Sequence, residues 1–284
     1  MNHRAEIALH QYLEKVVNGK GGISQDVSSQ ISKDVYEAVL KQFGSNKPTD
    51  FKLRMSNVGR PYCQLWFEKN KPETALPKPT TFVMNMLLGD IVEAVFKGLL
   101  KEAGVEYKDS DSVALALEDA SIKGTYDIAI DGSVDDIKSA SDWSFKHKFE
   151  SFDTLKNGDA FGYIGQLAGY AKASGLKAGG WWVINKANGD FKYVPANNID
   201  VETEVKSIQS IYDKLKVNKF ERCFEAEVET FRGKPTGNKV LGTTCSFCDY
   251  RYACWPTLQE LPAVKSQAKE PKIMKYVELA QEYR

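Results

Sequence analysis

Two aspartates and a lysine surround a tight turn in the middle of the chain. Residues 124–138 read GTYDIAIDGSVDDIK, and the alternation of apolar and polar residues on both sides of the Asp-Gly pair is typical of a β-hairpin with a two-residue turn. Counting outward from that pair places Asp127 directly opposite Asp136. Lys138 follows two residues later and lies on the same face of its strand. The spacing therefore predicts two carboxylates and one ammonium at one point.

Such a pair of carboxylates predicts a site for a divalent cation. Two negative charges at cross-strand distance repel one another unless a proton or a cation lies between them. Oxygen ligands suit Mg²⁺ or Mn²⁺, and Mg²⁺ commonly binds one or two protein carboxylates and leaves its other positions to water and phosphate. The alternative is an ordinary solvated hairpin face, because Asp and Lys are common on exposed strands.

A third acid, Glu93, lies on a predicted helix. The pattern of residues 81–103, closed by Gly104, predicts one long helix. Its apolar stripe consists of Val92, Val95, Phe96, Leu99 and Leu100. Glu93 lies toward the edge of this stripe, so its carboxylate could lean from the core toward the hairpin. Glu93 is also well explained as an exposed helical residue.

Four short motifs occur in order along the chain: GDIVE at 89–93, GTYD at 124–127, DIKSAS at 136–141 and QLAGY at 166–170. Their order and spacing resemble the PD-(D/E)XK nucleases, particularly the RecB-like exonucleases. The resemblance implies a restriction-endonuclease-like fold and a reaction that hydrolyses DNA phosphodiester bonds to leave 5′-phosphates. It also implies the metal ligands, which are Glu93, Asp127, Asp136 and the backbone carbonyl of Ile137.

The resemblance assigns roles to three further side chains. Lys138 would orient or activate the attacking water and stabilise negative charge on the scissile phosphate; its alternative role is a surface lysine that pairs with Asp136. Gln166 and Tyr170 are four residues apart on one helical face and would position Lys138 or a DNA phosphate. Outside this motif, Gln and Tyr at that spacing are ordinary helix residues.

The chain has five cysteines, three of which cluster in the tail. Cys245, Cys248 and Cys254 have the tight spacing of metal ligands, and Cys63 would supply a fourth thiolate. Such clustering in an intracellular protein favours a metal over disulfides, and four cysteines suit either Zn²⁺ or an iron–sulfur cluster. The resemblance implies a [4Fe–4S] cluster with a structural role, because CRISPR-associated and other RecB-like nucleases often have one cysteine before the nuclease motifs and three after them. Cys223 is interpreted as a packed thiol.

Composition is that of a soluble, cytoplasmic protein. The 284 residues are 42% hydrophobic, and no apolar run approaches the length of a membrane span. The N-terminal residues show no signal-peptide pattern. The 38 basic and 38 acidic residues balance, so the chain lacks the basic excess typical of proteins that coat nucleic acid. This balance weakens a nucleic-acid function in general but is compatible with an enzyme that binds a few phosphates. The three histidines, His3, His10 and His147, are scattered, so Ser-His-Asp and Cys-His hydrolysis lack support.

The remaining pattern predicts an α/β fold, a mixed sheet flanked by helices. Helices are expected within residues 1–44 and at 159–173 and 201–215, and a second hairpin joins strands at 181–186 and 190–195. We expect one integrated domain made of a helical N-terminal region with the first cysteine, a nuclease core, and a cysteine-bearing tail. Their ranges are 1–80, 81–215 and 216–284.

The predicted function is a metal-dependent DNA exonuclease that acts on single strands or DNA ends in recombination, repair or phage DNA metabolism. Trp181 and Trp182 could stack on bases, but a central strand more often buries aromatic residues, so we assign both to the core. The candidate DNA-contacting residues, alternatively solvated surface, are Arg54, Arg60, Lys146, His147 and Lys148. The expected partner is DNA, and a homo-oligomer or a recombination protein is a further candidate. The alternative function is a non-catalytic nucleic-acid-binding or assembly module.

Overall fold

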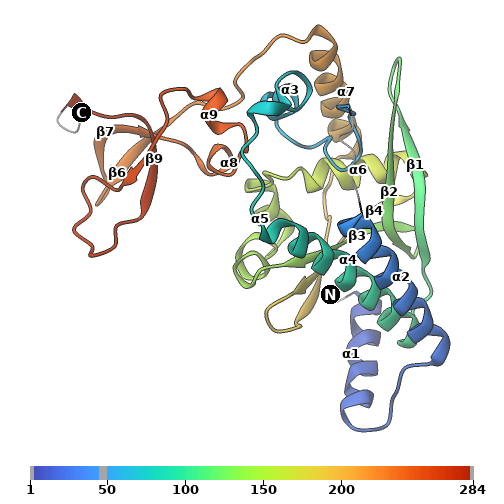
Figure 1. Cartoon of the computed structure of the whole chain (residues 1–284). Helices are drawn as coiled ribbons and strands as arrows, with labels where there is room; N and C mark the ends of the chain where they lie inside the picture. Colours follow the sequence, from blue (N-terminus) through green and yellow to red (C-terminus); the bar gives the residue numbers. More distant parts are fainter. Residues whose placement is uncertain (1–2, 45–49, 282–284) are drawn as a thin grey trace. The chain divides into compact units, whose positions relative to one another are not determined.

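The computed structural model describes residues 3–44 and 50–281 (Figure 1). The chain forms two compact units whose sequence ranges interleave. The first unit consists of Met1–Thr49, Leu53–Gly59 and Lys78–Ser210, and the second of Asp50–Lys52, Arg60–Pro77 and Ile211–Arg284. Every residue of the predicted acidic centre falls in the first unit, and all five cysteines fall in the second.

A five-stranded mixed sheet organises the first unit. Its strands, in spatial order, are β1 (Lys108–Ala116), β2 (Ser121–Ile130), β3 (Ser133–Ala140), β4 (Lys177–Asn185) and β5 (Phe191–Pro195). The pair β3–β4 is parallel and the other neighbours are antiparallel. Parallel neighbours require a long crossover connection, which here contains the helices that follow β3. The α/β class with a mixed sheet is confirmed.

The two hairpins occur where the sequence predicts them. In the first turn, Asp131 and Gly132 both have positive φ, at 53° and 76°, as a type I′ turn requires. Ile130 pairs with Ser133 across this turn, which is the predicted register. Strand β1 was not predicted, because Lys108–Ala116 is rich in polar residues and largely exposed.

The described residues of the first unit include the helices α1 (Arg4–Val17), α2 (Gln25–Phe43), α4 (Thr81–Glu102), the π-helix η2 (Ser144–Lys148), α5 (Phe152–Asn157) and α6 (Tyr163–Ser174). Helix α4 matches its predicted range closely. It contacts β3, α1 and α2, and Figure 1 shows it alongside α2. Helix α6 contacts β3 and β4. These two helices are therefore the elements that can bring side chains to the strand bearing Asp136.

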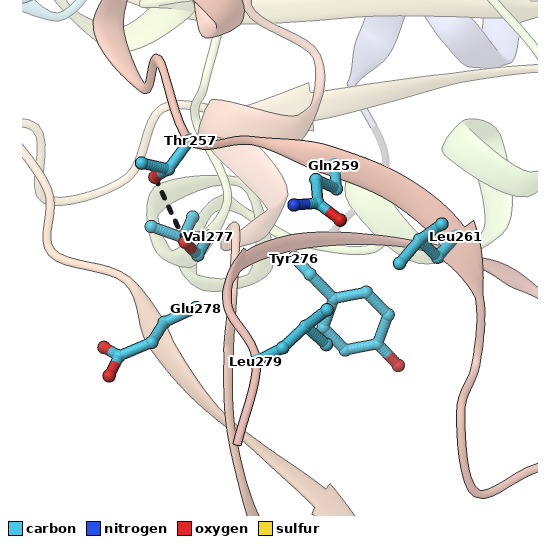
Figure 2. A pocket seen from close by; sticks show the side chains of 7 residues that line it. All are labelled: Thr257, Gln259, Leu261, Tyr276, Val277, Glu278 and Leu279. Atoms are coloured by element: carbon cyan, nitrogen blue, oxygen red, sulfur yellow. Dashed lines mark hydrogen bonds between the residues drawn. The ribbon is translucent and has the colours of Figure 1, made fainter. Parts of the chain in front are cut away.

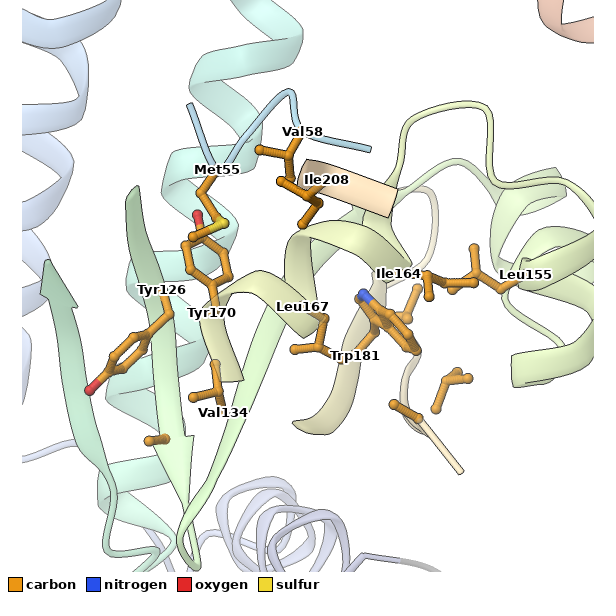
Figure 3. Close-up of a cluster of buried hydrophobic side chains, with 14 of the residues drawn as sticks. Met55, Val58, Tyr126, Val134, Leu155, Ile164, Leu167, Tyr170, Trp181 and Ile208 are labelled. Atoms are coloured by element: carbon orange, nitrogen blue, oxygen red, sulfur yellow. The ribbon is translucent and has the colours of Figure 1, made fainter. Parts of the chain in front are cut away.

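The core of this unit lies on both faces of the sheet. Trp181 and Trp182 are adjacent in β4, so their side chains point to opposite faces, and both are fully buried. Trp181 packs in a cluster with Leu167 and Tyr170 of α6 (Figure 3). Trp182 packs in a second cluster with side chains of α1 and α4, such as Phe96. The assignment of both tryptophans to the core is confirmed.

The second unit has its own small sheet, which the sequence did not predict. Its strands, in spatial order, are β6 (Glu227–Phe231), β7 (Lys234–Val240), β9 (Ile273–Glu278) and β8 (Gln259–Pro262). Its helices are α3 (Tyr62–Asn70), η1 (Pro72–Thr74), α8 (Thr243–Ser246) and α9 (Arg251–Cys254), while α7 (Val201–Val217) belongs partly to each unit.

A buried carboxylate holds the small sheet together. Glu229 accepts hydrogen bonds from Tyr276 Oη, Thr236 Oγ1 and Asn238 Nδ2 at 2.7–2.8 Å. Because this interior is polar, the strands lack the apolar alternation by which strands are recognised in a sequence.

The small sheet also borders a cavity. This cavity in the second unit is lined by residues in and next to β8 and β9, among them Thr257, Leu261 and Tyr276, and holds none of the predicted site residues (Figure 2). Within the described ranges 3–44 and 50–281, the helices are too short or too polar to cross a membrane.

Candidate functional site

The acidic centre lies where strands β2 and β3 stop pairing. The last hydrogen-bonded pair of the hairpin is Ile128 with Asp135, and Asp127 and Asp136 occupy the next positions. There the Asp127 side chain replaces the backbone ladder: its Oδ2 accepts a hydrogen bond from the Ile137 amide at 2.8 Å. The negative charge of Asp136 also acts on the Asp127 carboxyl group. The structure thus brings the predicted pair together.

Burial and mutual repulsion control the protonation of this pair. Desolvation, followed by the negative charge of Asp136, raises the pKa of Asp127 to about 7. Lys138 and the Ile137 amide oppose this rise. The Asp127 carboxyl therefore keeps a proton part of the time near neutral pH. A divalent cation would take the place of this proton, because both remove the repulsion between the two charges.

Lys138 compensates part of the negative charge. Its Nζ lies 2.6 Å from Asp136 Oδ2, and the Asp136 side chain is only 3% exposed. Burial lowers the pKa of Lys138, but Asp136 and Asp127 outweigh it and raise the pKa above its ordinary value. The contact is an ion pair without hydrogen-bond alignment, so Asp136 Oδ2 remains a buried atom with no aligned donor. An ion with oxygen affinity fits such an atom.

Glu93 lies within electrostatic reach of the pair but has another partner. Desolvation, followed by the charge of Asp127, raises the pKa of Glu93. Its Oε1 lies 2.7 Å from Lys97 Nζ, which also lies 3.1 Å from Asp109. Lys97 was not singled out in the sequence, although its position one turn after Glu93 signals an ion pair. An ion at Glu93 would therefore compete with Lys97 for its carboxylate.

Gln166 and Tyr170 lie on one face of α6, as predicted. Gln166 Nε2 is 3.4 Å from Tyr170 Oη, a long hydrogen bond. Desolvation raises the pKa of Tyr170 to about 12, and the charges of Asp136 and Asp127 add to this rise. The Tyr170 hydroxyl is therefore within the electrostatic range of the acidic centre. Gly124 permits this approach, because a Cβ there would lie 2.9 Å from Tyr170 Cε1. The first glycine of the GTYD motif thus has a packing reason.

Asp135 is a buried acid that the sequence analysis did not single out. Its carboxylate accepts hydrogen bonds from the Gly180 amide, Trp182 Nε1 and Tyr193 Oη at 2.9–3.1 Å. Burial raises its pKa to about 7 despite these three donors. The sequence does contain a signal for this residue. Adjacent residues of a strand point to opposite faces of the sheet, so Asp135 must lie on the face opposite to Asp136. Asp135 fixes β3 against β4 and β5 and so holds Asp136 in place.

Aromatic and basic side chains adjoin Lys138. The Nζ of Lys138 lies 5.2 Å from the centre of the Tyr163 ring, and Lys148 Nζ lies 4.5 Å from the same ring. Of the other predicted DNA-contacting residues, Lys146 pairs with Asp142 at 2.9 Å. His147 packs on the Trp143 ring at 5.3 Å. Tyr163 was not singled out in the sequence, because a tyrosine at a helix start has no chemical signature.

The position of the two arginines differs. Arg54 lies in the first unit, where its backbone amide donates to Asn57 Oδ1 at 2.8 Å. Arg60 lies in the second unit and pairs with Glu68 at 2.7 Å. Arg54 thus belongs to the unit that holds the acidic centre, and Arg60 belongs to the other unit.

Four cysteines line a single cavity in the second unit. Cys63 comes from α3, and Cys245, Cys248 and Cys254 come from the segment around α8 and α9. Burial raises the pKa of Cys245 to about 11, and Cys254 and Cys248 add to this rise. The four soft donors that gather here suit Zn²⁺ or an iron–sulfur cluster, since a bound cation would offset the mutual repulsion of thiolates.

Metal-binding geometry is incomplete at both sites. Within residues 3–44 and 50–281, no group of three or more His, Cys, Asp or Glu side chains has the arrangement that holds a metal ion. At the acidic centre two carboxylates meet and the third pairs with Lys97. At the cysteines the four thiols share a cavity. The donor types fit the proposed ions at both places.

The interpretation of Cys223 as an isolated packed thiol is wrong. Cys223 is an exposed residue, and its Sγ accepts a hydrogen bond from the Cys63 amide at 3.0 Å. A hydrogen bond from the Cys63 thiol lowers the pKa of Cys223 to about 7. The fifth cysteine therefore stands beside one of the predicted ligands. The sequence gave no sign of this, because residues 63 and 223 are brought together only by the fold.

Comparisons with known proteins leave the site to be argued from its own geometry. No protein-family model matches the chain, and a search of curated proteins finds no match. Among solved structures, the chain is similar to one described as the crystal structure of SSO0001, with 13% sequence identity and a TM-score of 0.41. That likeness covers 81% of this chain and 96% of the other. A likeness of this degree carries no functional argument.

Proposed function

We propose that the first unit is a metal-dependent DNA exonuclease. The observation that carries the proposal is the buried Asp127–Asp136 pair, which must bind a proton or a cation, with the Lys138 ammonium beside it. Structural ion pairs usually satisfy their members, whereas Asp136 Oδ2 is buried without an aligned donor. Carboxylates that compete for one proton near pH 7 are typical of functional sites.

The proposed metal ligands are Asp127 and Asp136, with Mg²⁺ or Mn²⁺ as the ion. Glu93 and the Ile137 carbonyl are further candidates, and Glu93 would exchange its contact with Lys97 for the ion. When bound, such an ion activates a water molecule and neutralises the leaving oxygen of the phosphodiester. Water and DNA phosphate would occupy the positions that the protein leaves open.

Lys138 has the chemistry of a charge stabiliser. Its raised pKa keeps it protonated at neutral pH, so it holds a positive charge for the scissile phosphate and can orient the attacking water through its N–H groups. Tyr170 also stays protonated, because its pKa is about 12. The Tyr170 hydroxyl and the Gln166 amide would therefore donate hydrogen bonds to a phosphate oxygen. The products would have 5′-phosphates.

The same proposal includes the finer fold and the second metal. A D-x-K motif on a central strand of a mixed sheet, with acids at the point where two strands part, supports a restriction-endonuclease-like arrangement and the PD-(D/E)XK superfamily. We also propose a [4Fe–4S] cluster at Cys63, Cys245, Cys248 and Cys254, with Zn²⁺ as the alternative. A purified protein that is brown and contains iron and sulfide would support the cluster, and a colourless one with stoichiometric zinc would exclude it.

The test of the nuclease uses end-labelled DNA. Purified protein is incubated with single- and double-stranded substrates, labelled at either end, in Mg²⁺ or Mn²⁺. We expect release of the label from one end, which Asp136→Ala abolishes and Asp190→Ala does not, because Asp190 lies at the β4–β5 turn rather than at the acidic centre. Equal digestion by the Asp136→Ala variant would refute the assigned centre. Absence of digestion by the wild-type protein would instead leave a non-catalytic binding module as the better interpretation.

A further inference from the structure

We propose that Phe161, Tyr163 and Lys148 form a subsite that binds an unpaired nucleobase and its phosphate beside the acidic centre. The inference rests on the proposed function for its choice of ligand. It goes further by naming a feature of the substrate, an unpaired base, and the side chains that recognise it.

Three aromatic rings form a continuous stack from the core to the surface. Phe149 is buried, and its ring lies 5.8 Å from that of Tyr163 at an interplanar angle of 24°. The Tyr163 ring lies 5.7 Å from that of Phe161 at 14°. Phe161 ends the stack and is 57% exposed. Near-parallel aromatic rings at this separation are offset-stacked, so a planar base on Phe161 would extend an arrangement that already exists.

Two ammonium groups flank the stack. Lys148 Nζ lies 4.5 Å from the centres of both the Phe161 and the Tyr163 rings. Lys138, the lysine of the acidic centre, lies 5.2 Å from the Tyr163 ring on the same unit. Burial lowers the pKa of Lys148, and the positive charge of Lys138 adds to this fall, while the negative charge of Asp159 opposes it. Aromatic rings interleaved with positive charge are the pattern by which proteins bind single-stranded nucleic acid.

The backbone holds the stack in place before any ligand binds. Gly162 lies between Phe161 and Tyr163 in the sequence and has a φ of 76°. A Cβ at this position would lie 2.2 Å from the carbonyl carbon of Gly59. Asp159 accepts hydrogen bonds from the Tyr163 and Ile164 amides, both at 2.9 Å, and so caps α6. A platform that is already ordered binds more tightly, because no side-chain freedom remains to be lost.

A stacked base would also orient the strand. The Nζ atoms of Lys138 and Lys148 both lie close to the Tyr163 ring, so a nucleotide held by Phe161 would place a neighbouring phosphate near Lys138. A base inside a duplex is stacked on both sides and cannot reach Phe161. The subsite therefore favours single-stranded ends, and a duplex would have to fray before binding.

The test measures binding without cleavage. A fluorescein-labelled 20-nucleotide single strand is titrated with protein in Ca²⁺, and the fluorescence anisotropy gives Kd. Loss of one base–aromatic stack predicts that Phe161→Ala raises Kd by roughly five-fold to a hundred-fold. Phe161→Trp, which keeps a stacking surface, should bind as the wild type does. Phe43→Ala is the matched control, because Phe43 lies on α2 and is 60% exposed.

A strand of abasic residues separates stacking from charge. On this strand Phe161→Ala and wild type should bind equally, whereas Lys148→Gln should weaken binding to both strands and reduce the slope of log K against log salt by about 0.7. Unchanged binding of intact DNA by Phe161→Ala, or an equal loss on the abasic strand, would overturn the subsite. Base-dependent binding by a protein whose cleavage survives Asp136→Ala would instead overturn the nuclease assignment and leave the subsite standing.

Discussion

The acidic centre and the cysteine cavity are assembled in different ways. Asp127 and Asp136 are neighbours across one hairpin, so the turn alone sets their approach. The cysteines come from α3 and from a segment around α8 and α9, far apart in sequence. A metal at the hairpin would find Asp127 and Asp136 already brought together, whereas a metal at the cysteines would itself hold two distant segments together. The first metal should therefore serve the reaction and the second the fold.

The largest expected effect is the loss of the cysteine-bound metal. Structural metal sites contribute on the order of 10 kcal/mol to folding, so a chelator or Cys245→Ser should unfold much of residues 211–284. Hydrogen exchange followed by mass spectrometry would show lost amide protection there, with β2 and β3 still protected. Chelation of Mg²⁺ from the acidic centre should leave protection of both regions nearly unchanged. Equal losses of amide protection in residues 211–284 and in β2 and β3 would show that the two metals do not differ in their role in folding.

Replacing Lys138 should affect the reaction far more than the fold. Lys138→Met removes the positive charge that faces Asp136, and we expect DNA cleavage to fall by about 10²–10⁴-fold, as for loss of a positioned catalytic group. Lys177→Met is the control, because Lys177 is an exposed lysine on the adjacent strand. Initial rates of label release measure the effect, and circular dichroism checks the fold. A cleavage rate within a factor of ten of wild type would remove Lys138 from the chemistry.

The metal-free protein should lose stability as pH rises. The pKa of Asp127 and that of Asp135 are both about 7 in the folded chain and near 3.8 when unfolded. Between these values the folded state binds more protons than the unfolded state, so each group lowers the free energy of unfolding by up to about 1.4 kcal/mol per pH unit. Urea titrations in EDTA from pH 4 to 8 measure this slope.

Two additions to the titration assign the slope. Asp127→Asn should remove the share of the slope that comes from this carboxyl, because the amide does not titrate. Saturating Mn²⁺ should also flatten it, since an ion that binds the deprotonated pair replaces the proton. If neither change alters the slope of the free energy of unfolding against pH, Asp127 and Asp136 are both ionised in the folded protein and neighbouring groups compensate their charges.

The smallest effect is expected for Tyr170. Its hydroxyl lies 3.4 Å from Gln166 Nε2, and a hydrogen bond contributes about 0.5–1.5 kcal/mol, so Tyr170→Phe should slow cleavage by roughly two- to twelve-fold. The ring is retained, so its packing against Gly124 persists. Thermal denaturation should therefore give nearly the wild-type midpoint. A loss as large as that of Lys138→Met would give Tyr170 a direct role in the reaction.

Local rules account for what the sequence predicted. The Asp131-Gly132 turn fixes its own backbone, and the register from Ile130 outward follows from it. Helix α4 has a long apolar pattern and a glycine beyond its end. The Trp181–Trp182 pair identifies a strand buried on both faces. In each case the information lies within a few residues.

Features that depend on distant partners were missed. Strand β1 and the strands around Glu229 are polar, so their pairing is decided by neighbours that the pattern does not show. Lys97 pairs with Glu93 one turn away, a local signal that was overlooked, while the fold alone brings Asp109 to the same lysine. Cys223 reaches Cys63 across most of the chain. The position of Glu93 was predicted from the helix face, but its ion pair with Lys97 was not predicted.

The parallel pairing of β3 with β4 has a consequence for the order of folding. The β2–β3 hairpin is local and should form within about 1–10 μs, whereas β4 can join only after the chain has passed through α6. Asp127 and Asp136 would then meet while still open to water, before α6 brings Tyr170 over them. A divalent ion present during refolding would thus encounter its ligands early, and should speed the closure of the hairpin by removing the repulsion between them.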